Sequence, residues 1–207
     1  MVELGPLQGA GALPVVLAST SIARRALLQG AGIAFEIVAP GVDEDAVKRE
    51  LAGADAASLA TALADRKALA VSARRPGAVV IGGDSTLACD GRLFDKPADI
   101  DAACEQLRFL RGRVHELQSA VSVARDGEVV WRHIDTARLA MRPFSDDFLT
   151  RYVDASRDWL TSSVGAYRLE GTGAQLFERI DGDYFTILGL PLLPLLAWLR
   201  SAGVLRS

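Results

Sequence analysis

The residues best suited to chemistry follow a short apolar run. Val79-Val80-Ile81 leads into Gly82-Gly83-Asp84, so a carboxylate stands behind two glycines. A continuous run of β-branched residues is typical of a strand covered on both faces. Ligands of open α/β sheets bind beyond the carboxyl ends of strands, where glycines let the backbone approach them closely. We therefore expect Asp84 at the end of its strand, either in a binding site or as the cap of a turn.

A second set of residues is suited to binding phosphate. Ser19, Ser21 and Arg24 surround a predicted junction between a strand and a helix. Free backbone N–H groups and the helix dipole favour an anion there, and hydroxyls and a guanidinium add charge-assisted hydrogen bonds. The alternative is simple helix capping with a solvated arginine. Lys67 and Lys96 are further cations, although lysines at such positions are most often solvated surface residues.

Asp43 and Glu44 could together hold a divalent cation, or they could be a solvated acidic loop.

Several familiar sites are missing from the sequence. No phosphate-binding GxxxxGK[ST] loop and no GxGxxG between a strand and a helix are present. The two histidines, His115 and His133, have no zinc-site spacing, and we expect His115 to make a structural hydrogen bond within a strand.

The elements that must position these residues alternate between strand and helix. The expected strands are 14–18, 35–38, 79–84 and 176–180, with a hairpin of 117–124 and 129–139 around Asp126-Gly127. The expected helices are 22–29, 56–71, 100–110, 145–155 and 191–202. This alternation with one long hairpin predicts an α/β fold with a mixed β-sheet flanked by helices.

Composition places the chain among globular proteins. Its 207 residues suffice for a full core, and half of them are hydrophobic. A net charge of −3 gives no general affinity for polyanions. Cys89 and Cys104 form no CxxC and are expected as reduced thiols of a cytoplasmic protein. We expect residues 1–13 to form a loose tail, residues 14–207 to form one domain, and no segment to span a membrane.

Taken together, the motifs are far less ordinary than each is alone. The order of these motifs along the chain, from about residue 14 to 204, resembles that of the Maf family of nucleoside triphosphate pyrophosphatases. The resemblance rests on Leu17-Ala18-Ser19-Thr20-Ser21, Arg24-Arg25, Val42-Asp43-Glu44, Lys67-Ala68, Gly82-Gly83-Asp84, Lys96-Pro97, Gly112-Arg113, Gly165-Ala166-Tyr167, Glu170-Gly171 and Gly189-Leu190-Pro191.

This resemblance implies a two-lobed fold with a central nucleotide cleft. It also implies hydrolysis of a nucleoside triphosphate to a monophosphate and pyrophosphate with Mg²⁺ or Mn²⁺. Asp84 falls on the family's general-base position and, with Glu44, on the metal positions. Ser19, Ser21, Arg24, Lys67 and Lys96 fall on phosphate-contacting positions.

The resemblance also bears on which base is preferred, through Ala23, Ser85 and Glu170. The branch that prefers dTTP and UTP has Arg, Thr and Gln at these positions. Glu170 and the segment Leu176-Phe177-Glu178-Arg179 look more like the branch acting on 7-methyl-GTP, yet that branch has an aromatic residue where this chain has Ala23.

We therefore expect an enzyme that acts on a nucleoside triphosphate, with non-standard or modified nucleotides as its substrate class. A strict 7-methyl-GTP pyrophosphatase is one alternative, and a non-catalytic nucleotide-binding regulator of cell division is another. We expect no nucleic-acid polymer and no membrane as partners, and a homodimer stays possible.

Overall fold

The computed structural model of the chain describes residues 5–9 and 11–206. The chain divides into two compact units. The first contains the residues up to Ser85, Ser119–Asp135 and the residues from Tyr184 onward. The second contains Thr86–Gln118 and Thr136–Asp183. The prediction of one domain over residues 14–207 stays a prediction.

The strands form a mixed sheet in the order β2-β1-β3-β5-β6-β7, with β4 paired to β3. β1 runs parallel to β2 and β3, whereas β4 and β7 run antiparallel to β3 and β6. The strands are β1 (Val15–Ala18), β2 (Glu36–Ile37), β3 (Val79–Cys89), β4 (Arg92–Phe94), β5 (Val114–Arg125), β6 (Glu128–Met141) and β7 (Phe177–Asp181). The predicted α/β class with a mixed sheet is confirmed.

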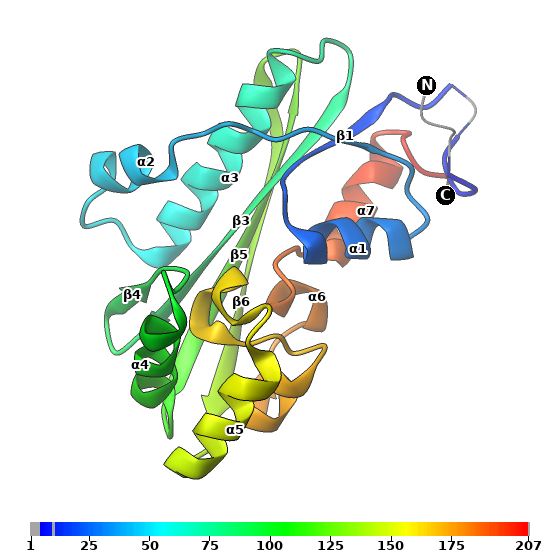
Figure 1. Cartoon of the computed structure of the whole chain (residues 1–207). Coiled ribbons are helices and arrows are strands. Elements are labelled where there is room, and N and C mark those ends of the chain that lie inside the picture. The colour runs from blue at the N-terminus through cyan, green and yellow to red at the C-terminus, as the bar shows by residue number, and fades with distance from the viewer. Residues whose placement is uncertain (1–4, 10, 207) are drawn as a thin grey trace. The chain divides into compact units, whose positions relative to one another are not determined.

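Seven α-helices occur in the described residues (Figure 1). They are α1 (Ile22–Gly30), α2 (Glu44–Glu50), α3 (Ala56–Ser72), α4 (Ile100–Leu110), α5 (Asp146–Ser156), α6 (Tyr184–Ile187) and α7 (Leu192–Ser201). All of them except α2 and α6 correspond to predicted helices. No described helix is long and apolar enough to cross a bilayer.

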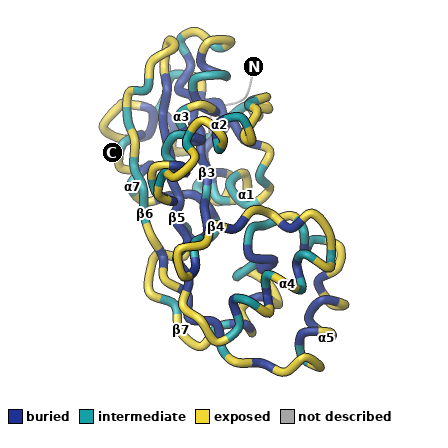
Figure 2. The backbone as a smooth tube through the Cα atoms, turned by 90° about the vertical axis from the view of Figure 1, so that its left-hand side faces the viewer, coloured by how far each residue is buried: buried dark blue, intermediate teal, exposed yellow. Residues whose placement is uncertain are grey.

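Helices cover both faces of the sheet in the first unit. On one face, Leu28 of α1 and Leu195 and Leu199 of α7 pack in the same apolar cluster as Leu17 and Ile81 of the sheet. On the other face, α3 packs through alanines and Val71 against the strands. Figure 2 shows β3 and β5 buried along most of their length between these layers. Burial of this apolar surface is the main force that holds the layers together.

The described residues near the N-terminus are held against the end of the chain. Gln8 is buried, forms an isolated antiparallel bridge with Leu205, and hydrogen-bonds the backbone of Ala34. The backbone N–H of Arg206 donates to the carbonyl of Leu7 at 2.9 Å. The segment predicted as a loose tail is therefore ordered by contacts at these positions, while residues 1–4 and 10 lie outside the described residues.

Helix α3 makes polar contacts in three directions from three consecutive residues. Asp65 accepts a hydrogen bond from Ser122 of β5 at 2.6 Å, and Arg66 donates to Glu50 of α2 at 2.8 Å. Lys67 pairs with Asp84 of β3. Successive helical residues lie about 100° apart around the helix axis, so one turn of α3 reaches three different elements.

The second unit is built around α4, α5 and a segment of short 3-10 helices, Leu160–Ser162, Val164–Ala166 and Thr172–Leu176. His115 lies in its core, where Nε2 hydrogen-bonds the hydroxyl of Tyr167 at 2.9 Å and the ring packs beside Phe177. The predicted structural hydrogen bond of His115 is thereby confirmed. Burial lowers the pKa of His115 to about 4, so its imidazole is neutral at pH 7.

Candidate active site

Asp84 lies in the middle of β3 and not at its end, so the predicted position is wrong. The parallel pairing of β1 with β3 stops at Ala18 and Gly82, while β3 itself continues to Cys89. Asp84 is therefore just past the end of the parallel part of the sheet. A strand does end at this point, as expected, but the strand that ends is β1. The Asp84 residue is only 8% exposed.

Lys67 meets Asp84 inside the first unit. Its Nζ lies 2.6 Å from Oδ1 of Asp84 and 2.7 Å from Oε1 of Glu44, and the residue is only 6% exposed. The usual expectation of a solvated lysine is thus wrong for this position. One ammonium bridges two carboxylates, and such charge-assisted contacts are what allow a lysine to be buried.

Gly82 permits this pairing because it brings α3 close to β3. A Cβ at Gly82 would lie 2.7 Å from the backbone nitrogen of Ala68 and 2.9 Å from its Cβ, and it would also overlap the carbonyl oxygen of Ala64. Only a residue without a side chain fits there. The short alanines of α3 complete the close approach, and Lys67 then reaches Asp84.

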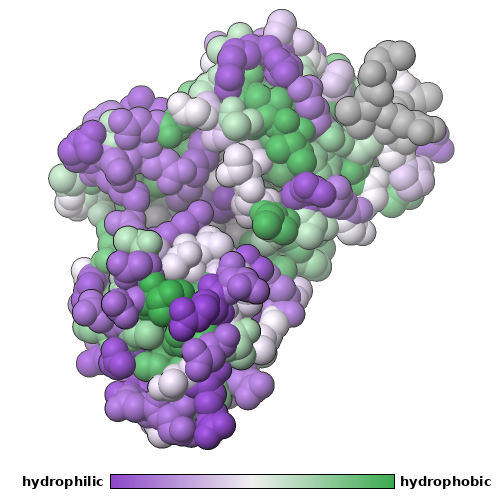
Figure 3. All heavy atoms as spheres, viewed as in Figure 1, coloured by the Kyte–Doolittle hydropathy of each residue, from purple (hydrophilic) through white to green (hydrophobic). Residues whose placement is uncertain are grey.

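Glu44 comes from α2, which the sequence analysis did not predict as a helix. Asp43 is the N-cap of α2 and accepts a hydrogen bond from the backbone N–H of Ala46 at 2.9 Å. This geometry directs Asp43 to the helix end and leaves Glu44 to contact Lys67. The surface around α2 is strongly hydrophilic (Figure 3). An Asp followed by Glu-Asp and then Lys-Arg is a helix signal that the short segment contains.

Arg24 enters the site from α1. Its Nε donates to the carbonyl oxygen of Gly189 at 2.7 Å and its Nη2 donates to Oγ of Ser85 at 3.0 Å. Burial lowers the pKa of Arg24, whereas the nearby charges of Asp84 and Glu44 raise it. Those carboxylates favour the charged guanidinium, so Arg24 is a half-buried cation whose hydrogen bonds are partly satisfied.

Ser19 and Ser21 shape the loop before α1. Oγ of Ser21 accepts from the backbone N–H of Arg24 at 3.3 Å and is the N-cap of the helix, as predicted. Oγ of the buried Ser19 accepts from the backbone N–H of Ser21 at 3.2 Å. Capping is therefore established for Ser21, and a phosphate contact stays a prediction for both serines. Ala23 stands beside Arg24 on the first turn and offers only a methyl group.

Ser85 makes hydrogen bonds inside the protein. Its Oγ accepts from Arg24 and lies 2.8 Å from Oγ of Ser119 on β5. No sequence pattern predicted a role for Ser119 or for Gly189. Ser119 is one of two serines in the mostly apolar strand β5, and no local sequence signal distinguishes it. Gly189 appears only within the Gly189-Leu190-Pro191 motif.

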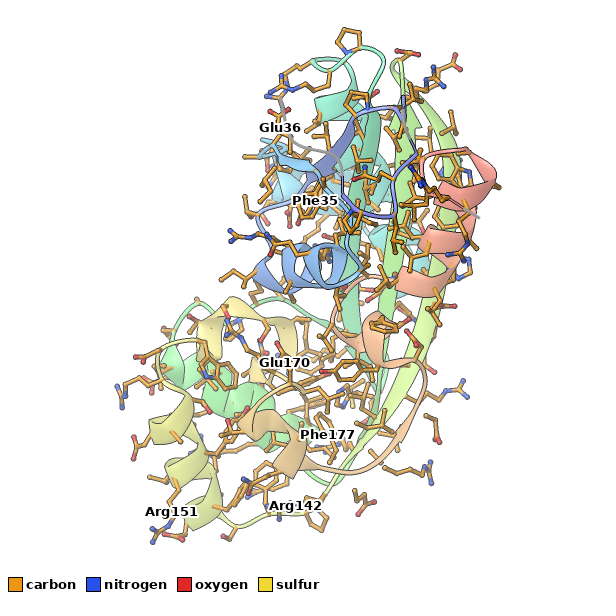
Figure 4. All side chains as sticks on the ribbon, turned by 90° about the vertical axis from the view of Figure 1, so that its right-hand side faces the viewer. Phe35, Glu36, Arg142, Arg151, Glu170 and Phe177 are labelled. Carbon is orange, nitrogen blue, oxygen red and sulfur yellow. The ribbon has the colours of Figure 1, made fainter. Side chains whose placement is uncertain are left out.

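The remaining predicted site residues, Lys96 and Glu170, belong to the second unit. Lys96 is exposed after β4, and Glu170 is exposed on the loop before the 3-10 helix Thr172–Leu176 (Figure 4). Glu170 lines a cavity of about 290 Å³ together with Trp159 and Arg168, and the Arg168 guanidinium carbon lies 5.0 Å from the centre of the Trp159 ring. This cavity has one carboxylate and one aromatic residue in its wall.

The first unit offers two carboxylates to a divalent cation. Among the described residues no group of three or more His, Cys, Asp or Glu side chains is arranged to hold a metal. Asp84 and Glu44 nevertheless converge on one ammonium, so their oxygens already face a shared positive charge. Mg²⁺ is commonly bound by one or two carboxylates, several waters and substrate phosphates. The pair fits such a site.

Comparisons with known proteins show which family the chain is similar to. Residues 14–202 match the sequence model of the family described as Maf-like protein. A nucleoside triphosphate pyrophosphatase of Caulobacter vibrioides is 54% identical over 194 residues, which cover 93% of this chain and 97% of that protein. A 7-methyl-GTP pyrophosphatase of Rhizobium meliloti is 50% identical over 193 residues, 92% and 97% of the two chains. One of Brucella abortus is 52% identical over 188 residues, 90% and 94% of the two chains.

Proposed function

The chain belongs to the Maf-like protein family, and from this premise we propose that it is a nucleoside triphosphate pyrophosphatase. It hydrolyses a nucleoside triphosphate to a nucleoside monophosphate and pyrophosphate. The observation that carries this proposal is the buried Asp84, paired with Lys67 and close to the charge of Arg24. The names of relatives at about half identity, over nearly the full chain, point to the same reaction.

Asp84 is proposed as the general base. Oδ1 is engaged by Lys67, which leaves Oδ2 to accept a proton from the attacking water. As that proton moves to Oδ2, the water oxygen attacks in line, the anhydride between the α and β phosphorus atoms breaks, and pyrophosphate leaves. A divalent cation held by Asp84 and Glu44 would supply charge stabilisation on the phosphates when bound.

The phosphate contacts are assigned to cations and hydroxyls. Arg24 and Lys67 offset negative charge within the first unit, and Ser19 and Ser21 retain hydroxyl hydrogens for donation. Lys96 of the second unit is proposed as a further phosphate contact, supported by the resemblance of Lys96-Pro97 to the family motif. The nucleotide cleft between two lobes and the homodimer stay predictions.

The reaction is tested by measuring which phosphate product is released. We expect pyrophosphate, and no orthophosphate, from at least one member of a panel of ordinary and modified triphosphates with Mg²⁺ or Mn²⁺, and we expect a chelator to abolish it. Release of orthophosphate would refute the reaction. Nucleotide binding without any turnover would favour the non-catalytic regulator.

Asp84→Asn tests the general base. Asparagine keeps an oxygen that accepts from Lys67 but cannot take a proton, so turnover should fall by ~10²–10⁴-fold with the fold intact. Asp43→Asn is the matched control, because it removes a neighbouring charge while asparagine caps a helix as well as aspartate does. Equal activity of Asp84→Asn and Asp43→Asn would remove Asp84 from the mechanism.

For the base, guanine-type or modified purine triphosphates, 7-methyl-GTP among them, are proposed to be favoured over dTTP and UTP. An ionised Glu170 only accepts hydrogen bonds, and guanine offers two donors on its Watson–Crick edge. Thymine and uracil place two acceptors beside their single donor, which a carboxylate repels. We expect kcat/KM for guanine-type triphosphates to exceed that for dTTP and UTP by roughly ten- to hundred-fold.

Glu170→Gln should narrow this gap, because an amide can also donate a hydrogen bond. Glu178→Gln is the control, since Glu178 is an exposed carboxylate of the same unit on β7. A wild-type preference for dTTP or UTP would refute the base assignment and leave the reaction type untouched. Ser85 is half-buried and engaged by Arg24, so its link to base choice passes through Arg24.

A further inference from the structure

The guanidinium of Arg24 lies in a fitted cradle. Besides the hydrogen bonds to Gly189 and Ser85, two glycines leave room for it. A Cβ at Gly83 would lie 3.1 Å from Nε of Arg24, and a Cβ at Gly189 would lie 3.4 Å from Nη2 and 3.2 Å from Oγ of Ser85. Gly189 also has φ +97°, a conformation that side chains other than glycine rarely adopt. The arginine is therefore confined on several sides.

A chain of hydroxyls continues from this cradle into the core of the first unit. Oγ of Ser119 donates to the backbone carbonyl of Thr186 at 2.7 Å, and Ser119 is completely buried. Oγ of Ser85 and Oγ of Ser119 are 2.8 Å apart. A hydroxyl has one hydrogen, and a carbonyl can only accept. Because Ser119 gives its hydrogen to Thr186, the Ser85 hydroxyl must donate to Ser119.

The direction of each hydrogen bond in the chain is thereby fixed. The hydrogen of Ser85 points to Ser119, so only lone pairs of Ser85 Oγ face Arg24, and they accept from Nη2. Of the five N–H groups of the guanidinium, one on Nε and one on Nη2 are used inside the protein. Three remain, two on Nη1 and one on Nη2, which is the fork that binds two oxygens of one phosphate.

We propose that Ser119 is a positioning residue that fixes the direction of the Ser85 hydroxyl and thereby aims the free fork of Arg24 at a phosphate. The inference rests on the proposed function, because it takes a phosphate as the ligand of Arg24. An arginine already held in its binding rotamer loses little freedom when the phosphate arrives. Ser85 consequently acts through Arg24 and not by contact with the base.

The test compares two serines of one strand. Ser119→Ala removes the acceptor of Ser85, and kcat/KM for the triphosphate should fall by roughly 2- to 10-fold, the worth of one net hydrogen bond. Ser122→Ala is the control, because Ser122 is also completely buried on β5 and also loses one side-chain hydrogen bond, to Asp65. We expect its kcat/KM to stay at the wild-type value, because Nε of Arg132 still holds Asp65 at 2.9 Å, with a melting temperature lowered as in Ser119→Ala.

The connection to Arg24 is tested by a double-variant cycle. In an Arg24→Ala background, Ser119→Ala should cause no further loss of kcat/KM, and Ser85→Ala with Ser119→Ala should be no worse than Ser85→Ala alone. Additive losses in these pairs, or equal losses for Ser119→Ala and Ser122→Ala, would overturn the proposal. Ser119→Cys, with a weak donor of similar shape, provides the same cycle if the alanine variant does not fold.

The same cycle separates this inference from the proposed function. If the wild-type protein releases no pyrophosphate from any triphosphate, the proposed function fails, and the cycle is measured by calorimetry on the binding of inorganic pyrophosphate. Weaker binding by Ser119→Ala that disappears in the Arg24→Ala background upholds the positioning role. Equal binding by the wild type and Ser119→Ala overturns it.

Discussion

Replacement of Lys67 by methionine should destabilise the protein as well as inactivate it. Methionine keeps the length and helix propensity of lysine but removes the ammonium. Asp84 then remains as a buried charge without the contact at 2.6 Å, and breaking a buried pair in this way costs about 3–5 kcal/mol. With an m-value of about 2–3 kcal/mol/M in urea, a loss of 3 kcal/mol lowers the unfolding midpoint by about 1–1.5 M.

The assay is urea unfolding followed by circular dichroism at pH 7.5, with two companion variants. Arg66→Met is the matched control, since Arg66 is the preceding residue of α3 and its ion pair with Glu50 is about half exposed on both sides. It should cost at most about 1 kcal/mol. Lys67→Met combined with Asp84→Asn should regain most of the stability, because no buried charge is left unpaired. A midpoint of Lys67→Met equal to that of Arg66→Met, or no recovery in the double variant, would refute the reasoning.

Three further outcomes are expected. Lys96→Ala should leave the melting temperature unchanged because the residue is exposed, while its KM for triphosphate rises roughly ten-fold or more, as loss of a charge-assisted hydrogen bond requires; normal kinetics would return Lys96 to the class of solvated lysines. Gly82→Ala should push α3 from β3 and lower both stability, by about 1–3 kcal/mol, and activity, whereas Gly30→Ala, where a Cβ meets open space, should do neither. The pKa of His115 is about 4 in the folded protein, so below pH 6.5 the unfolded chain, with an ordinary histidine, binds a proton that the folded protein does not. The stability is therefore full above pH 6.5 and falls as the pH drops toward about 4, by about 2 kcal/mol at pH 5. His115→Phe should flatten this dependence of stability on pH in denaturation curves, and an unchanged dependence would contradict the prediction.

The sequence predicted the elements well where local chemistry determines them. Ser21 caps α1 and Asp126-Gly127 turns β5 into β6, both through residues whose side-chain or backbone preferences act over a few positions. Helix α2 was missed because a seven-residue helix has too few turns for an apolar period to stand out, although its N-cap was visible. Asp84 was placed at a strand end because its partner β1, and not β3, ends there.

The site was harder to predict because its contacts join distant positions. Lys67 carried a signal that went unused: it falls on the stripe Ala60, Ala64, Ala68 and Val71, which is the buried face of α3. A lysine on such a stripe indicates a buried partner. Ser119 gave no comparable signal, since its importance depends on Ser85 and Thr186, which lie 34 and 67 residues away in the sequence.

The three polar contacts of α3 also settle which way the helix is turned. Alanine forms much of its buried face, and such a smooth ridge permits a close approach but provides few shapes that interlock with the strands. A rotation of one residue would bring larger side chains beside Gly82, where the two backbones already lie too close for one added Cβ. It would also separate Asp65, Arg66 and Lys67 from Ser122, Glu50 and Asp84 at the same time. Close packing and polar contacts thus select the same orientation, and in that orientation the ammonium of Lys67 faces Asp84.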